Sequence, residues 1–287
     1  MHTQSYQLIG IIGHPLGHTL SPVMHTAAFE NLQLPYKFGV LDVTDEFLPA
    51  LISSLRKCEI AGANVTVPYK QRVVPFLDEL NEDASALNAV NTIVCREGRL
   101  LGFNTDSIGL QRTFEPVKEK IRNASVFILG AGGAARAALH AIAKGFAPGL
   151  VRVYNRTAAR GTAVVAEFTK LFPRIRHECV TDSRTLQSVV SESSLIVNTT
   201  SVGMAPNVGA APLSPDIRFS NQQIIVDIIY NPIETALLRR ARSDGAQTIN
   251  GVEMFVQQGA KSFELWTGKV FPIDLARQVV TQALKSA

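Results

Sequence analysis

Short apolar runs alternate along this chain with longer segments in which apolar positions recur every three or four residues. Gln7–Ile12 and Tyr36–Leu41 have the length and composition of strands, whereas Pro22–Leu32 and Asp45–Arg56 have the helical pattern. Strands that alternate with helices are typical of parallel βαβ units. The pattern therefore predicts an α/β fold.

A second series of the same kind follows further along the chain. Its predicted strands are Ala124–Leu129, Val151–Tyr154, Leu195–Val197 and Gln223–Asp227, each followed by a helix or a loop. The segment around Asp106–Lys120 predicts a helix that joins the two series. We expect the second series to form a separate, mostly parallel sheet.

Serine, proline and glycine residues mark the ends of several of these elements. Ser21-Pro22 predicts a helix start, with the serine as N-cap and the proline at the first helical position. Cys95–Arg99, between two apolar runs, predicts a hairpin turn. Helical periodicity returns in Val252–Trp266 and Ile273–Lys285.

Two domains are therefore predicted. Residues 1–107 form an N-terminal α/β domain that the helices of residues 251–287 complete, and residues 108–250 form the second domain. The whole chain of 287 residues is 46% hydrophobic and 18% charged, which is typical of a globular protein with a substantial core.

Charge and hydropathy narrow the class of partner. A net charge of +4 is compatible with nucleic acid, but no Lys/Arg-rich run or interleaved aromatic patch accompanies it, so we expect no nucleic-acid partner. The most apolar stretch, Val126–Ala143, contains glycines as well as Arg136 and His140, which disfavours a membrane span. No signal peptide is evident. We expect a cytoplasmic protein, as a monomer or homodimer, that binds small anionic ligands.

A glycine-rich turn follows the first strand of the second series. Gly130, Gly132 and Ala135 form a Gly-X-Gly-X-X-Ala turn between the strand Val126–Leu129 and an alanine-rich helix. This context is typical of dinucleotide binding, because the glycines allow a tight turn and let the backbone approach a pyrophosphate at the helix N-terminus. The alternative is a loop between packed elements. The candidate cofactor-binding residues of this turn are Gly130, Ala131, Gly132, Gly133 and Ala134.

The next strand indicates which dinucleotide is bound. NAD enzymes usually carry Asp or Glu about 20 residues beyond the turn, to hold the ribose 2′-hydroxyl. Here Asn155, Arg156 and Thr157 follow the strand, and Arg160 comes soon after. No acid repels a 2′-phosphate and guanidinium groups can bind it, so NADP is favoured over NAD. The alternative is that these arginines are only solvated surface charges.

A lysine and an aspartate in the first series are candidates for proton transfer. Lys70 follows a β-rich run that Pro68 ends, and Asp106 closes a second polar cluster, Gly102–Asp106. A lone lysine is usually a solvated charge, but Asn91-Thr92 also closes a strand-like segment. Reduction of a ketone by hydride needs a proton donor, and a lysine beside an aspartate can supply one.

Together these motifs resemble the shikimate dehydrogenase family, in order and in spacing, from residue 10 to about residue 268. The matching segments are His18–Pro22, Asn64–Lys70, Ala89–Thr92, Gly102–Asp106, Gly130–Ala134, Asn155–Thr157, Asn198–Met204 and Gln258–Phe263. The resemblance implies a substrate domain, a Rossmann-type NADP-binding domain, and reversible reduction of 3-dehydroshikimate to shikimate with NADPH.

The resemblance also implies roles for individual residues. Lys70 and Asp106 become the catalytic pair, and Thr19 and Ser21 hold the substrate carboxylate. The ring hydroxyls are bound by Thr66, Asn91, Asp106 and Gln258, while Tyr230 closes the substrate site and Ile228 and Gly251 lie near the nicotinamide. Each polar side chain also has a purely structural alternative, such as a helix cap for Ser21 or a turn residue for Asn91.

Two other functions stay open at this stage. Thr19 replaces the usual serine of the family, and relatives that oxidise quinate also vary in this region, so a quinate/shikimate dehydrogenase that acts in the catabolic direction is the alternative. A non-catalytic dinucleotide sensor is the other, although Lys70 and Asp106 argue against it. The histidines show no metal-ligand spacing, and we expect no metal.

Overall fold

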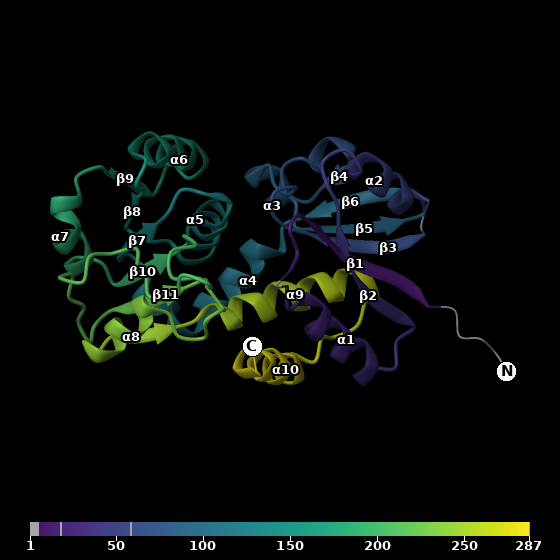
Figure 1. Ribbon diagram of the computed structural model, residues 1–287. Helices are drawn as coiled ribbons and strands as arrows, with labels where there is room; N and C mark the ends of the chain where they lie inside the picture. Colours follow the sequence, from purple (N-terminus) through teal and green to yellow (C-terminus); the bar gives the residue numbers. More distant parts are fainter. Residues whose placement is uncertain (1–5, 18, 58, 287) are drawn as a thin grey trace. The chain divides into compact units, whose positions relative to one another are not determined.

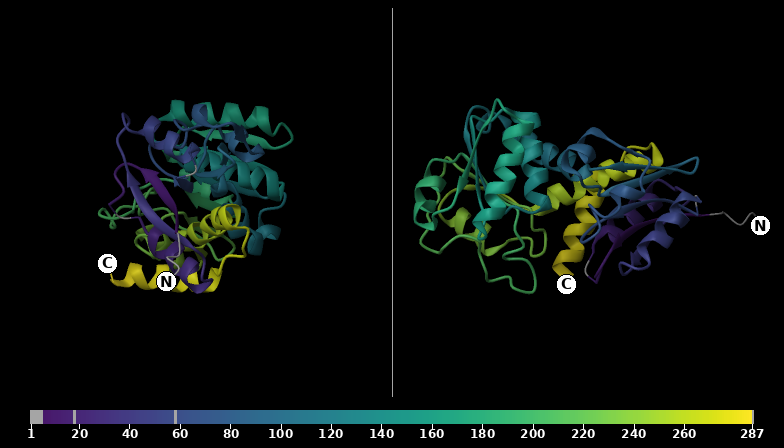
Figure 2. Two further views of the ribbon diagram at one scale, coloured as in Figure 1. Left: turned by 90° about the vertical axis from the view of Figure 1, so that its right-hand side faces the viewer. Right: turned by 90° about the horizontal axis from the view of Figure 1, so that it is seen from above.

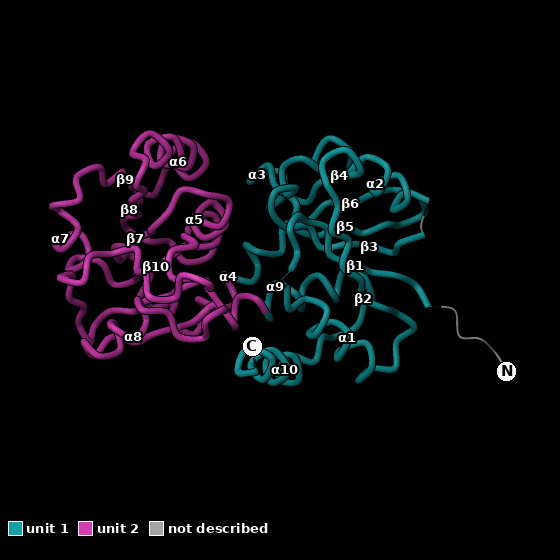
Figure 3. Tube along the Cα trace, in the orientation of Figure 1, with its two compact units in different colours: residues 1–109, 256–287 teal, residues 110–255 magenta. Residues whose placement is uncertain are grey.

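The computed structural model describes residues 6–17, 19–57 and 59–286. It divides into two compact units, unit 1 with residues 1–109 and 256–287, and unit 2 with residues 110–255 (Figure 3). The divisions fall inside two helices, α4 (Thr105–Phe114) and α9 (Gly251–Thr267), a few residues after the sequence-predicted positions 107 and 250. No helix of the described residues is long and apolar enough to cross a membrane.

Unit 1 is built on a six-stranded sheet of order β2-β1-β3-β5-β6-β4 (Figure 1). The strands β2, β1 and β3 are parallel, as predicted, because helices connect them. The sheet is nevertheless mixed, since β5 runs antiparallel to both β3 and β6. The strands are β1 (Gln7–Gly13), β2 (Tyr36–Asp42), β3 (Ile60–Val65), β4 (Glu79–Leu80), β5 (Thr92–Arg96) and β6 (Arg99–Phe103).

The predicted turn at Cys95–Arg99 is the cause of the antiparallel pairing. Glu97 and Gly98 connect β5 to β6 with φ angles of 52° and 78°. Two consecutive residues with positive φ match the twist of a two-residue hairpin. This hairpin brings the chain back along itself, so that the end of β6 returns to the start of β5, where Phe103 pairs with Thr92.

Helices cover the sheet of unit 1, and α1 packs against α10 (Figure 2). The predicted N-cap role of Ser21 is wrong, because Ser21 already lies inside the first turn and Leu20 occupies the cap position without a side-chain hydrogen bond. Thr19 Oγ1 instead accepts a hydrogen bond from the Ser21 N–H, at 3.3 Å. The other helical elements of the unit are α1 (Ser21–Asn31), α2 (Leu48–Arg56), η1 (Val74–Phe76), α3 (Glu82–Leu87) and α10 (Ile273–Ser286).

The predicted helix over Asp106–Lys120 is shorter than its pattern suggested. The α-helix α4 ends at Phe114, and the segment η2 (Glu115–Lys120) continues as a 3₁₀ helix. The reason is Pro116, which has no N–H to donate and whose ring would clash with the carbonyl of Arg112 in an α-helix.

Unit 2 contains six parallel strands in the order β12-β11-β10-β7-β8-β9. The chain moves outward from the central β7 to β8 and β9, and then returns to the other side of β7. This is the doubly wound order of dinucleotide-binding domains, with its switch point between β7 and β10. The prediction of a mostly parallel, Rossmann-type sheet is confirmed. The strands are β7 (Ser125–Leu129), β8 (Leu150–Tyr154), β9 (Arg176–Val180), β10 (Leu195–Asn198), β11 (Ile224–Asp227) and β12 (Gln247–Ile249).

Helices on the sheet of unit 2 bury its apolar side chains. α5 packs against β7, α6 against β8 and β9, and α8 against β11 and β12. Phe127, Ile196 and Leu237 are fully buried members of one of its apolar clusters. The helical elements of the unit are α5 (Gly133–Phe146), α6 (Ala158–Leu171), η3 (Ser183–Thr185), α7 (Leu186–Ser191) and α8 (Ala236–Ser243).

Candidate active site

In unit 1, the two residues predicted to transfer a proton are in direct contact. Lys70 Nζ lies 2.6 Å from Asp106 Oδ2, and Asn91 Nδ2 donates to Asp106 Oδ1 at 2.8 Å. The Asp106 side chain is 13% exposed and that of Lys70 is 31% exposed. The carboxylate is therefore held through both of its oxygens, while the ammonium group stays accessible to a ligand.

Local structure explains why these three side chains meet. Lys70 follows β3, and β5 pairs antiparallel with β3 so that the Asn91 carbonyl accepts from the Val65 N–H at 2.7 Å. Asp106 lies in the first turn of α4, directly after β6. A carboxylate is stabilised there by the N-terminal end of the helix dipole.

The other predicted substrate residues of unit 1 lie on neighbouring segments. Thr66 follows β3, and its N–H donates to the Ile12 carbonyl of β1 at 2.9 Å. Thr19 and Ser21 follow β1, so Thr66 and these two residues share the carboxyl edge of two adjacent parallel strands. Their described hydrogen bonds do not reach Lys70 or Asp106. His18, the first residue of its motif, lies outside the described residues.

Gln258 enters from another part of the chain, on α9. Its backbone carbonyl accepts a hydrogen bond from Ser262 Oγ, and Ser262 Oγ lies 3.1 Å from Thr105 Oγ1, next to Asp106. α9 is thereby joined to the segment that carries the predicted catalytic carboxylate.

In unit 2, the glycine-rich turn has the geometry that a bound pyrophosphate requires. Gly130 has a φ of 113°, and a Cβ atom there would lie 2.6 Å from Thr199 Oγ1. A Cβ at Gly132 or Gly133 would meet no atom within 4 Å. The open space lies at the N-terminus of the 14-residue helix α5, where an anion is favoured. The turn therefore fits a dinucleotide.

The segment after β8 fits a 2′-phosphate. Asn155 Nδ2 donates to the Thr157 carbonyl at 2.9 Å, which shapes the turn into α6. Arg156 and Arg160 are exposed, and neither forms an ion pair among the described residues. No acidic side chain stands at the end of the strand, so both guanidinium groups are available to an anion.

The remaining predicted cofactor and substrate residues of unit 2 lie around the end of β11. The Ile228 carbonyl approaches Gly251 so closely that a Cβ there would lie 2.1 Å from the oxygen, which only glycine allows. The Tyr230 ring packs on Phe255 with centroids 4.7 Å apart, and burial raises the pKa of Tyr230. Tyr230 is thus a neutral phenol on the same short segment as Ile228.

The sequence patterns missed the residue that fixes this segment. Asp227 is fully buried and accepts from Asn198 Nδ2 at 3.0 Å, from the Ile229 N–H at 3.1 Å and from Thr235 Oγ1 at 2.7 Å. Burial raises the pKa of Asp227, and these hydrogen bonds oppose the shift. An aspartate at the end of an otherwise apolar strand was the available signal.

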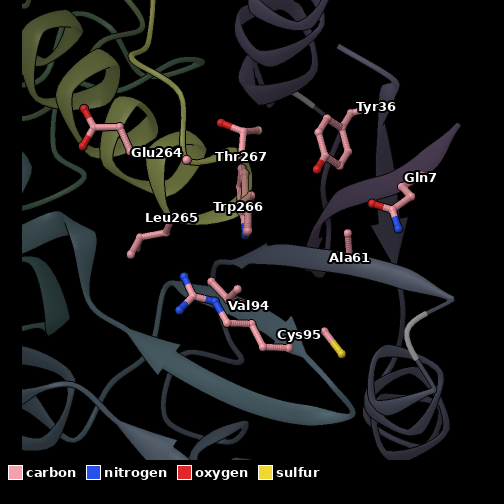
Figure 4. Close-up of a pocket in the computed structure, with 11 residues that line it drawn as sticks. Gln7, Tyr36, Ala61, Val94, Cys95, Glu264, Leu265, Trp266 and Thr267 are labelled. Carbon is pink, nitrogen blue, oxygen red and sulfur yellow. The ribbon is translucent and has the colours of Figure 1, made fainter.

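Unit 1 has a cavity at the amino-terminal edge of its sheet, opposite the edge that carries the candidate active site. It has a volume of about 410 Å³, and its lining includes Gln7, Tyr36, Ala61 and Trp266 (Figure 4). None of the predicted site residues lines it, so it is separate from the candidate active site. Among the described residues, no three His, Cys, Asp or Glu side chains gather as a metal ion would require.

Comparison with known proteins shows the family to which the chain belongs. Residues 11–93 match the family model of the shikimate dehydrogenase substrate binding domain, and residues 251–281 match that of the shikimate 5′-dehydrogenase C-terminal domain. The shikimate dehydrogenase (NADP(+)) of Shouchella clausii is 41% identical over 262 residues, which cover 91% of this chain and 92% of that protein.

Two solved structures are also similar to this chain. The shikimate 5-dehydrogenase of Thermus thermophilus, in complex with NADP(H) and shikimate, superposes with a TM-score of 0.85 at 33% identity, over 97% of this chain and 100% of that chain. The quinate dehydrogenase of Corynebacterium glutamicum, in complex with NAD, superposes with a TM-score of 0.88 at 29% identity, over 97% and 99% of the two chains.

Proposed function

The chain belongs to the shikimate dehydrogenase family, and on that premise we propose that Lys70 and Asp106 carry out its reversible, NADPH-dependent reduction of 3-dehydroshikimate to shikimate. The reaction is that of an oxidoreductase acting on a CH–OH group, and it belongs to the biosynthesis of aromatic amino acids. The single observation that supports the catalytic pair most directly is the contact of 2.6 Å between Lys70 Nζ and Asp106 Oδ2.

NADPH, when bound, supplies the hydride for the carbonyl carbon. The open backbone of the glycine-rich turn and the N-terminus of α5 would hold its pyrophosphate, and the turn after β8 would hold its 2′-phosphate. Ile228 and Gly251 would lie beside the nicotinamide. The proposed cofactor residues are Gly130, Ala131, Gly132, Gly133, Ala134, Asn155, Arg156, Thr157, Arg160, Ile228 and Gly251.

Lys70 donates the proton that the reduced oxygen needs. Its Nζ is positioned by Asp106 Oδ2, and Asp106 is in turn fixed by Asn91 through Oδ1. An ionised carboxylate offers about four lone-pair sites, so Asp106 can accept a substrate hydroxyl as well. The interaction of Lys70 with the substrate oxygen is stronger in the transition state than with the bound substrate, and only such an interaction accelerates the reaction.

The other proposed substrate contacts orient the ring. Thr19 and Ser21 bind the carboxylate at the edge formed by β1 and β3. Thr66, Asn91 and Gln258 bind ring hydroxyls together with Asp106, and Tyr230 closes the substrate site. The proposal thus assigns the substrate to unit 1 and the cofactor to unit 2.

Quinate oxidation is the weaker alternative. The fold of a quinate dehydrogenase is equally similar, but that neighbour is in complex with NAD, whereas this chain presents Arg156 rather than an acid after β8. A dinucleotide sensor without catalysis would not need the Lys70–Asp106 pair. Steady-state rates with shikimate and quinate, each against NADP and NAD, separate these functions, and we expect shikimate with NADP to be preferred.

For location and assembly, the proposal is a cytoplasmic enzyme that acts as a monomer or homodimer on small molecules. Its net charge of +4 is accompanied by no Lys/Arg-rich run, which supports small anions rather than nucleic acid as ligands.

The proposed function is tested by Lys70→Ala. We expect kcat to fall by about 10²–10⁴-fold, the usual contribution of a general acid or base, while the KM for shikimate changes far less. Lys70→Met is the control that keeps the aliphatic stem without the charge, and it should lose as much. Near-normal kcat with a raised KM would make Lys70 a binding residue only.

A further inference from the structure

Five polar side chains form a buried cluster behind the Lys70–Asp106 pair. None of them is more than 5% exposed. Buried polar groups are costly unless they are hydrogen-bonded, so a cluster of this size imposes one arrangement on its members. The members of this cluster, called the Ser262 cluster below, are Asn64, Asn91, Thr92, Thr105 and Ser262.

The hydrogen bonds of Asn91 leave its amide a single orientation. Its Oδ1 accepts from the Thr105 backbone N–H at 2.7 Å, and that group can only donate. Nδ2 must therefore face the other way, where it donates to Asp106 Oδ1 at 2.8 Å and to Thr105 Oγ1 at 2.9 Å. The amide of Asn91 is thus the link between the buried cluster and the catalytic carboxylate.

Ser262 is the member that α9 contributes. Its single hydroxyl proton goes to the Gln258 carbonyl at 3.1 Å, because a carbonyl can only accept. Its two lone pairs face three neighbours, Thr92 Oγ1 at 2.7 Å, Asn64 Nδ2 at 3.1 Å and Thr105 Oγ1 at 3.1 Å. All of its hydrogen-bonding capacity is therefore used, and these three neighbours all belong to the cluster.

A second hydrogen bond fixes the part of α9 that carries Ser262. Trp266, one helical turn further along α9, donates from Nε1 to the Ile93 carbonyl of β5 at 2.9 Å. Ser262 contacts Thr92, the preceding residue of the same strand. The two bonds together fix both the height and the rotation of α9 against β5.

We propose that Ser262 is a positioning residue of the reaction, which sets the orientation of the Asn91 amide through Thr92 and Thr105 and thereby the position of Asp106 and Lys70. Ser262 touches neither the substrate nor the reacting atoms in this scheme. The inference rests on the proposed function, because it assigns Ser262 to the support of that catalytic pair.

Loss of the Ser262 hydroxyl leaves Thr92 Oγ1 and Asn64 Nδ2 without that acceptor. The single hydroxyl proton of Thr92 then turns to Asn91 Oδ1, 3.1 Å away, and competes there with the hydroxyl of Thr105, which is 3.2 Å from the same atom. The Asn91 amide shifts, and its bond to Asp106 Oδ1 is weakened. A displacement of about 1 Å in a catalytic group can cost on the order of 10²-fold in rate.

The test is Ser262→Ala in the full-length protein, compared with Ser193→Ala. Ser193 is a buried serine, 2% exposed, whose hydroxyl also donates to the carbonyl four residues earlier, Val189, but it belongs to unit 2 and none of its described hydrogen bonds reaches a predicted site residue. We expect kcat for shikimate oxidation to fall about tenfold in Ser262→Ala, with the KM for NADP unchanged. Ser193→Ala should keep kcat within about twofold.

A double-mutant cycle separates positioning from general destabilisation. In an Asn91→Ala background the relay to Asp106 is already broken, so Ser262→Ala should cause less than about a twofold further loss of kcat. The proposal would be overturned if the kcat losses of Ser262→Ala and Asn91→Ala multiplied in the double variant. Equal kcat values for Ser262→Ala and Ser193→Ala would also overturn it. If Ser262→Ala does not fold, Thr92→Val interrupts the same relay and takes its place, with the same outcomes.

Failure of this inference is distinguishable from failure of the proposed function. If Lys70→Ala lowers kcat as expected while Ser262→Ala does not, the catalytic pair stands and only the positioning role is lost. If Lys70→Ala leaves kcat unchanged, the proposed proton transfer itself fails.

Discussion

At the scale of single residues, exposed charged side chains are available to bind a ligand, whereas buried polar side chains already form hydrogen bonds within the fold. Arg156 is exposed and has no ion-pair partner among the described residues, whereas Asp227 and the Ser262 cluster are buried and hydrogen-bonded. Removal of an exposed guanidinium after β8 should change the stability of the fold little. Its contribution should therefore be visible almost entirely in ligand binding.

Arg156→Ala should raise the KM for NADP by about one to two orders of magnitude, because a charge-assisted contact of about 1.5–3 kcal/mol is lost. The KM for NAD, which lacks the 2′-phosphate, should change little, and the Tm of the unliganded protein should stay the same. Steady-state kinetics with both cofactors measures this. An equal loss with NAD would refute the assignment of Arg156 to the 2′-phosphate.

His25 is a titratable group that the proposed mechanism does not use. It is fully buried, its ring stacks on Phe38 at 4.7 Å, and neither ring nitrogen has a hydrogen-bond partner within 3.5 Å among the described residues. Burial lowers the pKa of His25 to about 3, and the Asn64 side chain opposes this shift. The folded protein therefore holds His25 neutral, while the unfolded chain protonates it near pH 6.5.

Acid should destabilise the protein through His25. Below pH 6.5 the unfolded state binds a proton that the folded state does not, so the free energy of unfolding falls by about 1.4 kcal/mol per pH unit down to the folded pKa of about 3. In His25→Phe, which suits the aromatic surroundings, this loss is absent. Urea unfolding at pH 7 and pH 5 should show the variant losing about 2 kcal/mol less than the wild type. Parallel losses would contradict the buried, neutral histidine.

At the scale of elements, the docking of α9 on β5 connects the fold to the site. Gly62 makes this docking possible, because a Cβ there would lie 2.5 Å from Trp266 Nε1 and 2.7 Å from the Ile93 carbonyl. These are the two atoms of the hydrogen bond that anchors α9. A methyl group at residue 62 must therefore break that bond or move the helix.

Gly62→Ala should lower the free energy of unfolding by about 1–3 kcal/mol, the usual cost of overpacking. Trp266 is the only tryptophan of the chain, so its fluorescence reports the displacement directly. Gly39→Ala on β2 is the matched control, since a Cβ there would meet only the end of the Leu8 side chain at 3.2 Å. Unchanged fluorescence and stability in Gly62→Ala would show that α9 does not depend on this contact.

At the scale of the whole molecule, each unit has its own sheet, its own core and its own proposed ligand. Ligand fragments should therefore protect different parts of the chain. Adenosine 2′,5′-bisphosphate, which carries the 2′-phosphate of NADP, should slow amide hydrogen exchange at residues 131–135 and 155–160 of unit 2. Shikimate alone should slow exchange at residues 66–70 and 91–92 of unit 1, since bound ligands suppress local opening.

Hydrogen–deuterium exchange with each ligand separately measures this division. Arg156→Ala is the control that should abolish protection by the bisphosphate and leave protection by shikimate intact. Protection of residues 66–70 by the bisphosphate would instead assign the phosphate to unit 1.

The amino-acid sequence by itself determined those features that depend on neighbours in the chain. Apolar runs predicted four of the six parallel strands of unit 2, β7, β8, β10 and β11, but not β9 or β12. Gly130 and Gly132 predicted the turn into α5, and Cys95–Arg99 predicted the hairpin. Backbone conformation at such places is set by the local residues, so a local pattern is enough. The early end of α4 could also have been predicted from the sequence, because Pro116 cannot continue an α-helix.

Only the tertiary structure decided which distant residues meet. The antiparallel placement of β5 beside β3 brings Asn91 to Lys70 and Asp106, and the docking of α9 brings Ser262 to Asn64, 198 positions away in the chain. The neutral state of His25 follows from aromatic rings that four different elements or connecting segments supply around it. Periodicity carries no information on strand order or helix docking, because both depend on how separate apolar surfaces fit together once they are buried.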